Sequence, residues 1–174
     1  MRRAKGEMLL PPAIREVRGP VLFLGGPIQD APDWHALAIK MVRDISSDII
    51  IASPRKDYLP GEFVYERQVD WETYYLNRAA NFGAIMFWLA AQEYQTENEA
   101  VAFPRPYAQT TRQELGEWRS ERKHDHGINL IVGIEPGFSN ARYTRRRFAQ
   151  DCPGVPIFDN LADTCRAAAW SIIG

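Results

Sequence analysis

Short apolar runs alternate with amphipathic segments along most of this chain, and this alternation is the feature that most constrains its fold. The run from Val21 to Leu24 ends in Gly25-Gly26-Pro27, which is typical of a strand that is buried on both faces of a sheet and breaks into a glycine-rich loop. Comparable apolar runs predict four further strands, at Asp48 to Ala52, Ala84 to Leu89, Asn129 to Ile134 and Val155 to Phe158.

Between these runs, apolar residues recur at helical spacing. Asp33 precedes the first such segment, where its carboxylate is placed to cap a helix. Helices are predicted over residues 34–45, 62–81, 110 onward, 139–150 and 161–172, the fourth capped by Ser139 or Asn140. Strands and helices that alternate in this way form a parallel sheet with right-handed crossovers. We therefore expect an α/β fold, a three-layer αβα sandwich of Rossmann-like or flavodoxin-like type with a central, mostly parallel five-stranded sheet.

The size and composition of the chain fit one domain with a core of its own, since 45% of its 174 residues are hydrophobic and 25% are charged. Residues 1–19 contain Pro11-Pro12 and scattered charges without periodicity, so we expect an extended arm that could lie over a neighbouring subunit. Residues 20–174 are assigned to a single domain.

The formal net charge of -1 provides no general attraction to nucleic acid or to a membrane surface. A small-molecule ligand is therefore expected, with no nucleic-acid polymer and no membrane as a partner. Neither the two cysteines, Cys152 and Cys165, nor His124-Asp125-His126 has the pattern of a metal site. No apolar run reaches the ~20 residues that span a bilayer, and no signal-type segment follows Met1, which predicts a cytoplasmic location.

Glu114 is the principal candidate for a catalytic residue. It follows the irregular stretch from Glu93 to Pro106, a candidate lid or subunit contact, and it is predicted to lie in the first turn of a helix. A helix N-terminus favours an ionised carboxylate, so Glu114 is a candidate nucleophile. The pattern Thr111-x-x-Glu114 equally fits a capping box, in which the glutamate only satisfies a backbone N–H.

Two loops at strand ends are further candidates. Gly25-Gly26-Pro27-Ile28 either turns the chain after the strand or lets a base or sugar approach the backbone, because glycine has no side chain. It lacks the spacing of a dinucleotide fingerprint and of a P-loop. Arg55, after the second predicted strand, either holds a phosphate or is an ordinary turn residue.

The segment Gln68-Val69-Asp70-Trp71-Glu72 adds a second set of candidates within the helix predicted over residues 62–81. Helical geometry places Gln68, Trp71 and Glu72 on one face and Asp70 on another. If that face lines a cleft, Trp71 offers stacking and Glu72 a second acid or base. The alternative is a half-buried tryptophan flanked by solvated charges.

These segments together resemble the nucleoside 2-deoxyribosyltransferase-like family, over most of Pro20 to Tyr143. The motifs that carry the resemblance are FLGGPI (residues 23–28), QVDWE (68–72), AIMFW (84–88), QELG (113–116) and INLIVGIEPG (128–137). The resemblance implies that Glu114 attacks C1′ of a 2-deoxyribonucleoside or its monophosphate, expels the base and forms a covalent 2-deoxyribosyl-enzyme, which a second base or water resolves. Glu72 or Asp70 would contact a sugar hydroxyl or transfer a proton, and no metal or cofactor is needed.

The resemblance also implies a homodimer or a higher homo-oligomer in which a neighbouring subunit completes the pocket. Trp88, the last residue of AIMFW, and Thr111, two positions before QELG, are further substrate-binding candidates. The chain departs from the family pattern in residues 106–109, which lack an aspartate, and in residues 80–83, which lack an acid. Hydrolysis in place of transfer, or a non-catalytic nucleotide-sensing module in which Glu114 is only a cap, is compatible with these departures.

Overall fold

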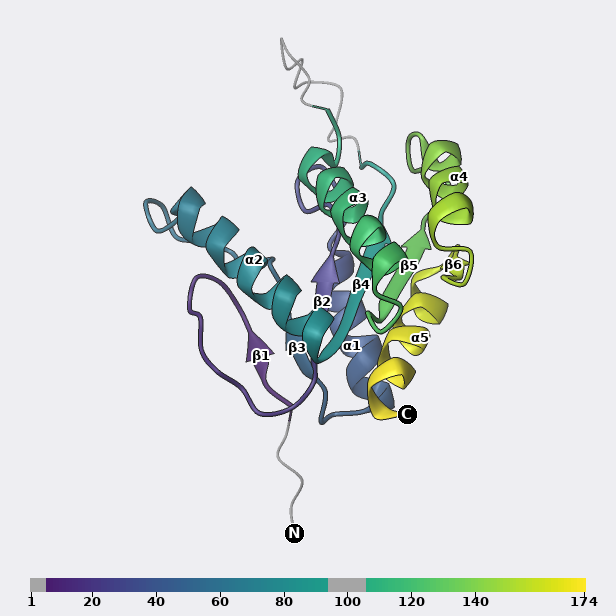
Figure 1. The fold of residues 1–174 in the computed structure, drawn as a ribbon. Coiled ribbons are helices and arrows are strands. Elements are labelled where there is room, and N and C mark those ends of the chain that lie inside the picture. Colours follow the sequence, from purple (N-terminus) through teal and green to yellow (C-terminus); the bar gives the residue numbers. More distant parts are fainter. Residues whose placement is uncertain (1–5, 94–105) are drawn as a thin grey trace.

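The structure, a computed structural model, describes residues 6–93 and 106–174. Over these residues, six strands and five helices alternate and form an α/β domain in three layers (Figure 1). All strand pairings are parallel, and the strand order in the sheet is β1-β3-β2-β4-β5-β6. The predicted fold class is confirmed, and the predicted strand count is wrong by one.

The elements have the following bounds. The strands are β1 (Met8–Leu9), β2 (Val21–Gly25), β3 (Ile50–Ala52), β4 (Gly83–Leu89), β5 (Leu130–Ile134) and β6 (Ile157–Phe158). The helices are α1 (Trp34–Ile45), α2 (Tyr65–Asn81), α3 (Gln109–His124), α4 (Ala141–Asp151) and α5 (Leu161–Ile173).

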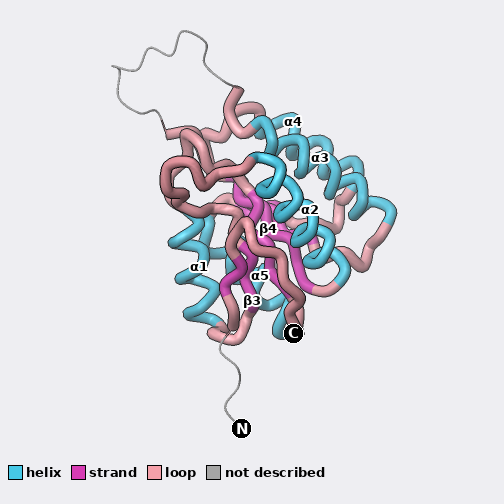
Figure 2. Tube along the Cα trace, turned by 90° about the vertical axis from the view of Figure 1, so that its left-hand side faces the viewer, coloured by secondary structure: helices cyan, strands magenta, loops and turns pink. Residues whose placement is uncertain are grey.

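The order of the strands determines which face each helix covers. The chain steps from β2 to β3 in one direction and then returns past β2 to β4, β5 and β6. Because parallel crossovers are right-handed, this reversal puts α1 on one face of the sheet and α2, α3 and α4 on the other. Figure 2 shows α1 on one side of the strands and these three helices on the opposite side. Helix α5 returns to the face of α1, against which it packs.

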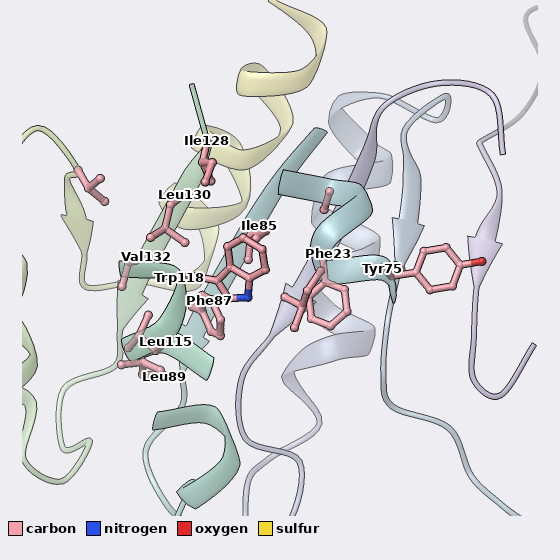
Figure 3. Close-up of a cluster of buried hydrophobic side chains, with 14 of the residues drawn as sticks. Phe23, Tyr75, Ile85, Phe87, Leu89, Leu115, Trp118, Ile128, Leu130 and Val132 are labelled. Carbon is pink, nitrogen blue, oxygen red and sulfur yellow. The ribbon is translucent and has the colours of Figure 1, made fainter. Parts of the chain in front are cut away.

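Side chains that alternate along β2 divide the interior into two cores. Val21 and Phe23 belong to the core under α2 and α3, and Leu22 and Leu24 belong to the core under α1 and α5. All four are at most 1% exposed. Figure 3 shows the first core, in which Trp118 of α3 lies among side chains of β4 and β5. Burial on both faces explains why the strands read as continuous apolar runs.

The additional strand comes from the arm that the sequence predicts for residues 1–19. Met8 and Leu9 pair with β3 at the edge of the sheet. The amide of Ile51 donates to the carbonyl of Glu7 at 3.0 Å, and the amide of Ser53 donates to the carbonyl of Leu9 at 3.0 Å. A strand of two residues is too short to show periodicity, so the sequence alone predicted only an extended segment.

After β1, the arm lies along α2 of its own chain. The Tyr75 hydroxyl is 3.1 Å from the backbone nitrogen of Arg15 and 3.0 Å from its carbonyl oxygen, so it accepts from one group and donates to the other. The Arg78 guanidinium donates to the carbonyls of Val17 and Gly19, at 3.3 and 2.6 Å. These bonds fix the entry into β2, whose end forms part of the site described below.

The predicted helix caps have different outcomes. The Asp33 carboxylate accepts from the amide of Ala36 at 3.2 Å, which confirms the cap of α1. Asn140 occupies the N-cap position of α4 with a φ of 61° and makes no side-chain capping bond, so that predicted cap is wrong. The Ser139 hydroxyl instead accepts from Arg112 at 2.7 Å.

Candidate active site

A cavity of about 430 Å³ lies at the carboxyl-end edge of the sheet, where the loop after β2 meets the first turns of α2 and α3. This is the position at which α/β sheets bind ligands, next to the point where the strand order reverses. The lining includes Gly25, Gly26, Pro27, Ile28 and Asp30 from the loop, Tyr65, Gln68, Val69 and Glu72 from α2, and Thr110, Thr111 and Glu114 from α3.

A second cavity, of about 280 Å³, adjoins the first between α2 and α3. Glu72 and Glu114 line both cavities, so the two carboxylates lie at the boundary between them. Glu117 and Trp118 line only the second cavity. The structure therefore brings together two acidic residues that are 42 positions apart in the sequence, as the sequence predicted.

The two carboxylates are partly buried, and their environment opposes ionisation. Burial raises the pKa of Glu114 to about 8, with further contributions from the negative charges of Glu72 and Glu117. Burial also raises the pKa of Glu72, and a hydrogen bond from Gln68 partly opposes that rise. The raised pKa of about 8 makes Glu114 the more weakly acidic of the groups that the structure places here, and both shifts oppose the negative charge.

The raised pKa contradicts the expectation that a helix N-terminus keeps Glu114 ionised. Helix α3 begins at Gln109, so Glu114 lies in its second turn rather than in the first, and the helix N-terminus does not hold its pKa low. The N-cap position is Ala108, which has a φ of 57° and makes no side-chain capping bond. Thr111 lies inside the helix, and the predicted capping box is wrong. Thr111 is buried and lines the larger cavity.

Gln68 links Glu72 to the loop after β3. Its side-chain amide nitrogen donates to Oε1 of Glu72 at 3.0 Å and to the carbonyl of Pro54 at 3.1 Å. Its amide oxygen accepts from the hydroxyl of Tyr58 at 2.7 Å. Both the oxygen and the nitrogen of the Gln68 amide are thus held, so its N–H is directed at Oε1 of Glu72.

The glycine-rich loop lines the larger cavity over Gly25, Gly26, Pro27 and Ile28, but its glycines have a packing reason. Gly26 has a φ of 149°, and a Cβ there would lie 2.3 Å from the carbonyl oxygen of Trp88. A Cβ on Gly25 would lie 2.7 Å from the ring of Phe87. The absence of side chains therefore lets this loop lie against the neighbouring strand β4, and the approach of a base or sugar to the same backbone stays a prediction.

The structure places the two tryptophan candidates outside the lining of the cavities. Trp71 is 0% exposed and packs against Phe23, at 6.0 Å between ring centroids, and against Tyr75, at 4.9 Å. Trp88 is 4% exposed and belongs to the core on the opposite face of the sheet. Neither ring is placed to stack on a ligand. Gln68 and Glu72 line the cavity from the predicted face of α2. Trp71, which was predicted on the same face, points into the core against the sheet instead.

Two charged candidates also lie outside the lining. Asp70 is exposed and lines neither cavity, because it projects from another side of α2. Arg55 follows the cavity-lining Pro54, but its Nε is 3.4 Å from Oδ1 of Asp33. Its charge is directed to α1, so the phosphate-binding reading of Arg55 has no support in this geometry.

The lining of the larger cavity includes residues that the sequence did not single out, among them Asp30, Tyr65 and Tyr107. Asp30 follows the glycine-rich loop and has a φ of 58°, and Tyr65 begins α2. Tyr107 lies just before α3, and its hydroxyl donates to the carbonyl of Ala90 at 2.7 Å. Each is next to a segment that the sequence identified, but no pattern distinguishes these neighbours. The predicted lid from Glu93 to Pro106 lies outside the described residues except at its two ends.

Searches against protein-family models and curated proteins found no match for this chain. Within residues 6–93 and 106–174, no group of three or more His, Cys, Asp or Glu side chains is placed to hold a metal ion. No helix in that part of the chain is long and apolar enough to cross a membrane. The features that bear on function are therefore the two carboxylates and the cavities that they share.

Proposed function

We propose that this protein cleaves the N-glycosidic bond of a 2-deoxyribonucleoside and transfers the 2-deoxyribosyl group to another nucleobase. The observation that supports the proposal best is that Glu72 and Glu114, from two neighbouring helices, line the same pair of cavities at the ligand-binding edge of the sheet. Paired carboxylates are the groups with which enzymes stabilise an oxocarbenium-like transition state and capture the sugar.

In this proposal Glu114 is the nucleophile. As the bond between C1′ and the base nitrogen breaks, positive charge develops on the sugar, and Glu114 forms the ester bond to C1′. A second base, or water, then displaces the carboxylate. Glu72 contacts a sugar hydroxyl or passes a proton to the departing base. Asp70, the other acid that the sequence indicated, has no role in this scheme because it lies outside both cavities.

The raised pKa of Glu114 is consistent with this role. A carboxylate that is disfavoured by burial and by a like charge gains most when a cationic sugar develops beside it. Its proton must leave before or during the attack, so the active form of the free enzyme is the one with Glu114 ionised. Burial raises the pKa of Glu72 as well, which is the direction that a group passing a proton to the base requires.

Chromatography of the bases released from each 2-deoxyribonucleoside, with and without added adenine, tests the proposal. The wild type is compared with Glu114→Gln and with Asp70→Asn, an exposed control on α2. New adenine nucleosides from wild type and Asp70→Asn, but not from Glu114→Gln, would support transfer. Free base without exchange would indicate a hydrolase. Binding without turnover, unchanged by Glu114→Gln, would indicate a nucleotide-sensing module and contradict the catalytic proposal.

The proposal includes a homo-oligomer in the cytoplasm. Exposed apolar side chains at the larger cavity support the assembly. The lining includes Phe63, Tyr65 and Val69, whose side chains are 52%, 67% and 39% exposed. A second copy that covers them would shield the reacting sugar from water. Light scattering at several protein concentrations tests this point, and a monomer at all of them would contradict it.

A further inference from the structure

Helix α3 begins without a side-chain cap. Its N-cap position, Ala108, has a φ of 57° and makes no capping bond from its side chain. Thr110, Thr111 and Glu114, which line the larger cavity, all lie in the two turns that follow. A capping side chain ordinarily fixes such a helix start, because it bonds the free N–H groups of the first turn. Here other contacts hold this wall of the cavity in place.

Arg112 makes several of these contacts from the far side of the helix. Its Nε donates to the carbonyl of Tyr107 at 3.1 Å, and one terminal nitrogen donates to the carbonyl and hydroxyl of Ser139 at 2.8 and 2.7 Å. The guanidinium carbon also lies 4.3 Å from the ring centroid of Phe138, within the range of a cation–π contact. Arg112 lines neither cavity, since two positions along a helix turn the side chain by about 200° away from Glu114.

The partners of Arg112 come from segments that lie far apart in the sequence. Tyr107 precedes α3, and its hydroxyl donates to the carbonyl of Ala90 at 2.7 Å, just after β4. Phe138 and Ser139 lie between β5 and α4. The rings of Tyr107 and Phe138 are buried, so the guanidinium contacts packed groups. Arg112 therefore joins the start of α3 to the ends of two neighbouring strands.

We infer that Arg112 is a positioning residue, which holds the start of α3 so that Glu114 meets C1′ of the bound sugar. This inference rests on the proposed function. A nucleophile that is displaced by about 1 Å can lose about a hundredfold in rate, whereas the groups that line the cavities stay available to bind the substrate. The role depends on shape as well as charge, because a planar guanidinium bonds in two directions at fixed angles and a lysine ammonium does not.

The test measures kcat and KM for transfer from a 2-deoxyribonucleoside to adenine in the wild type, Arg112→Ala and Arg112→Lys. We expect kcat to fall by about tenfold or more in both variants while KM changes by less than about threefold. Arg122→Ala, from the last turn of the same helix and outside both linings, should keep both constants. Millimolar guanidinium chloride should restore part of the kcat of Arg112→Ala, and ethylammonium chloride should not. Circular dichroism and thermal unfolding show whether each variant is folded.

Ser139→Ala keeps the test decisive if Arg112→Ala does not fold. It removes one acceptor of the guanidinium and leaves both carbonyls, so kcat should fall by a few-fold at unchanged KM. An unchanged kcat in folded Arg112→Ala, or in Ser139→Ala where Arg112→Ala is unfolded, would overturn the inference.

The remaining outcomes separate shape from charge and from the proposed function. A full kcat in Arg112→Lys would overturn the positioning role, because a charge alone would then suffice. A kcat of Arg112→Ala that both added cations restore alike, or that neither restores, would also contradict it. In all these cases the wild type still transfers the sugar, and the proposed function stands. A wild type that neither binds nor turns over any 2-deoxyribonucleoside would contradict the proposed function itself.

Discussion

Gln68 donates a hydrogen bond to Glu72 across one turn of α2, with 3.0 Å between Nε2 and Oε1. The same amide is held by Tyr58 and by the carbonyl of Pro54, so Glu72 is tied to the loop after β3 as well as to its own helix. One carboxylate of the pair is therefore positioned by its neighbours.

Replacing Gln68 by Leu should lower kcat by about tenfold or more and change the melting temperature only slightly. The substitution removes the donor that favours the ionised form of Glu72, so the pKa of Glu72 should rise and its orientation should loosen. Steady-state kinetics and thermal unfolding measure the two effects. Tyr58→Phe, which removes only the outer hydrogen bond, is the matched control and should have a smaller effect. An unchanged kcat in Gln68→Leu would exclude a role for this bond.

The pH dependence of kcat/KM should identify the role of Glu114. If the ionised carboxylate is the nucleophile, kcat/KM rises with pH and levels above about 8, the pKa of Glu114 in the free protein. If Glu114 acts as an acid, kcat/KM falls through the same range instead. Glu72→Gln removes a like charge and should move the midpoint to lower pH, whereas Asp70→Asn should leave it in place.

Glu114→Gln should stabilise the protein in alkaline solution. The pKa of Glu114 is raised from an ordinary 4.5 to about 8, so between these values the folded state keeps a proton that the unfolded state releases. The free energy of unfolding of the wild type therefore decreases as pH rises from about 4.5 to about 8. The glutamine side chain does not titrate, so the variant keeps its free energy of unfolding over this range. The variant should exceed the wild type in free energy of unfolding by a few kcal/mol near pH 9 and by almost nothing at pH 4.5. Denaturant unfolding at the two pH values measures it, and an equal difference at both would contradict the raised pKa.

Two glycine substitutions near the site should have opposite effects on stability. Gly26→Ala should destabilise the fold by about 3 kcal/mol or more, because its Cβ would lie 2.3 Å from the carbonyl oxygen of Trp88 and the φ of 149° disfavours a side chain. A Cβ on Gly116 would meet nothing within 4 Å, and alanine favours a helix interior. Gly116→Ala should therefore stabilise the protein by about 0.5–1 kcal/mol. Chemical denaturation measures the change in the free energy of unfolding for each variant. A change of the same sign in both variants would contradict the role given to the space around each glycine.

Tyr75→Phe should release the N-terminal arm from α2. The substitution removes the hydroxyl that bonds to both backbone groups of Arg15, at a cost of about 1–2 kcal/mol. Hydrogen exchange should accelerate at the backbone amide of Arg15 and its neighbours while the core strands stay protected. Tyr74→Phe, on the exposed side of the same helix, is the control. Unchanged exchange in Tyr75→Phe would show that other contacts hold the arm.

Local patterns determined most of the elements of this fold. Val21 to Leu24 is apolar at every position because β2 is covered on both faces, so the residue types alone indicate that this strand is buried. Asp33 caps α1 through a bond within one turn of chain, which is also a local interaction. The helix-forming segments show the 3.6-residue period that a single covered face requires. The cap and the helical period involve neighbours in the sequence, and the burial of β2 is reflected in its residue types, so these elements were predictable.

The tertiary structure alone decided which residues form the site. Trp71 and Glu72 are adjacent in the sequence, yet Trp71 is enclosed by the core and Glu72 lines the cavities, because the sheet lies under only one side of α2. The strand β1 exists only because β3 offers a free edge to residues about 40 positions away. The sequence identified Glu72 through its place on one face of a predicted helix, and Glu114 through its expected position at the start of another. Their raised pKa values arise from burial and, for Glu114, from the meeting of α2 with α3, which no local sequence pattern encodes.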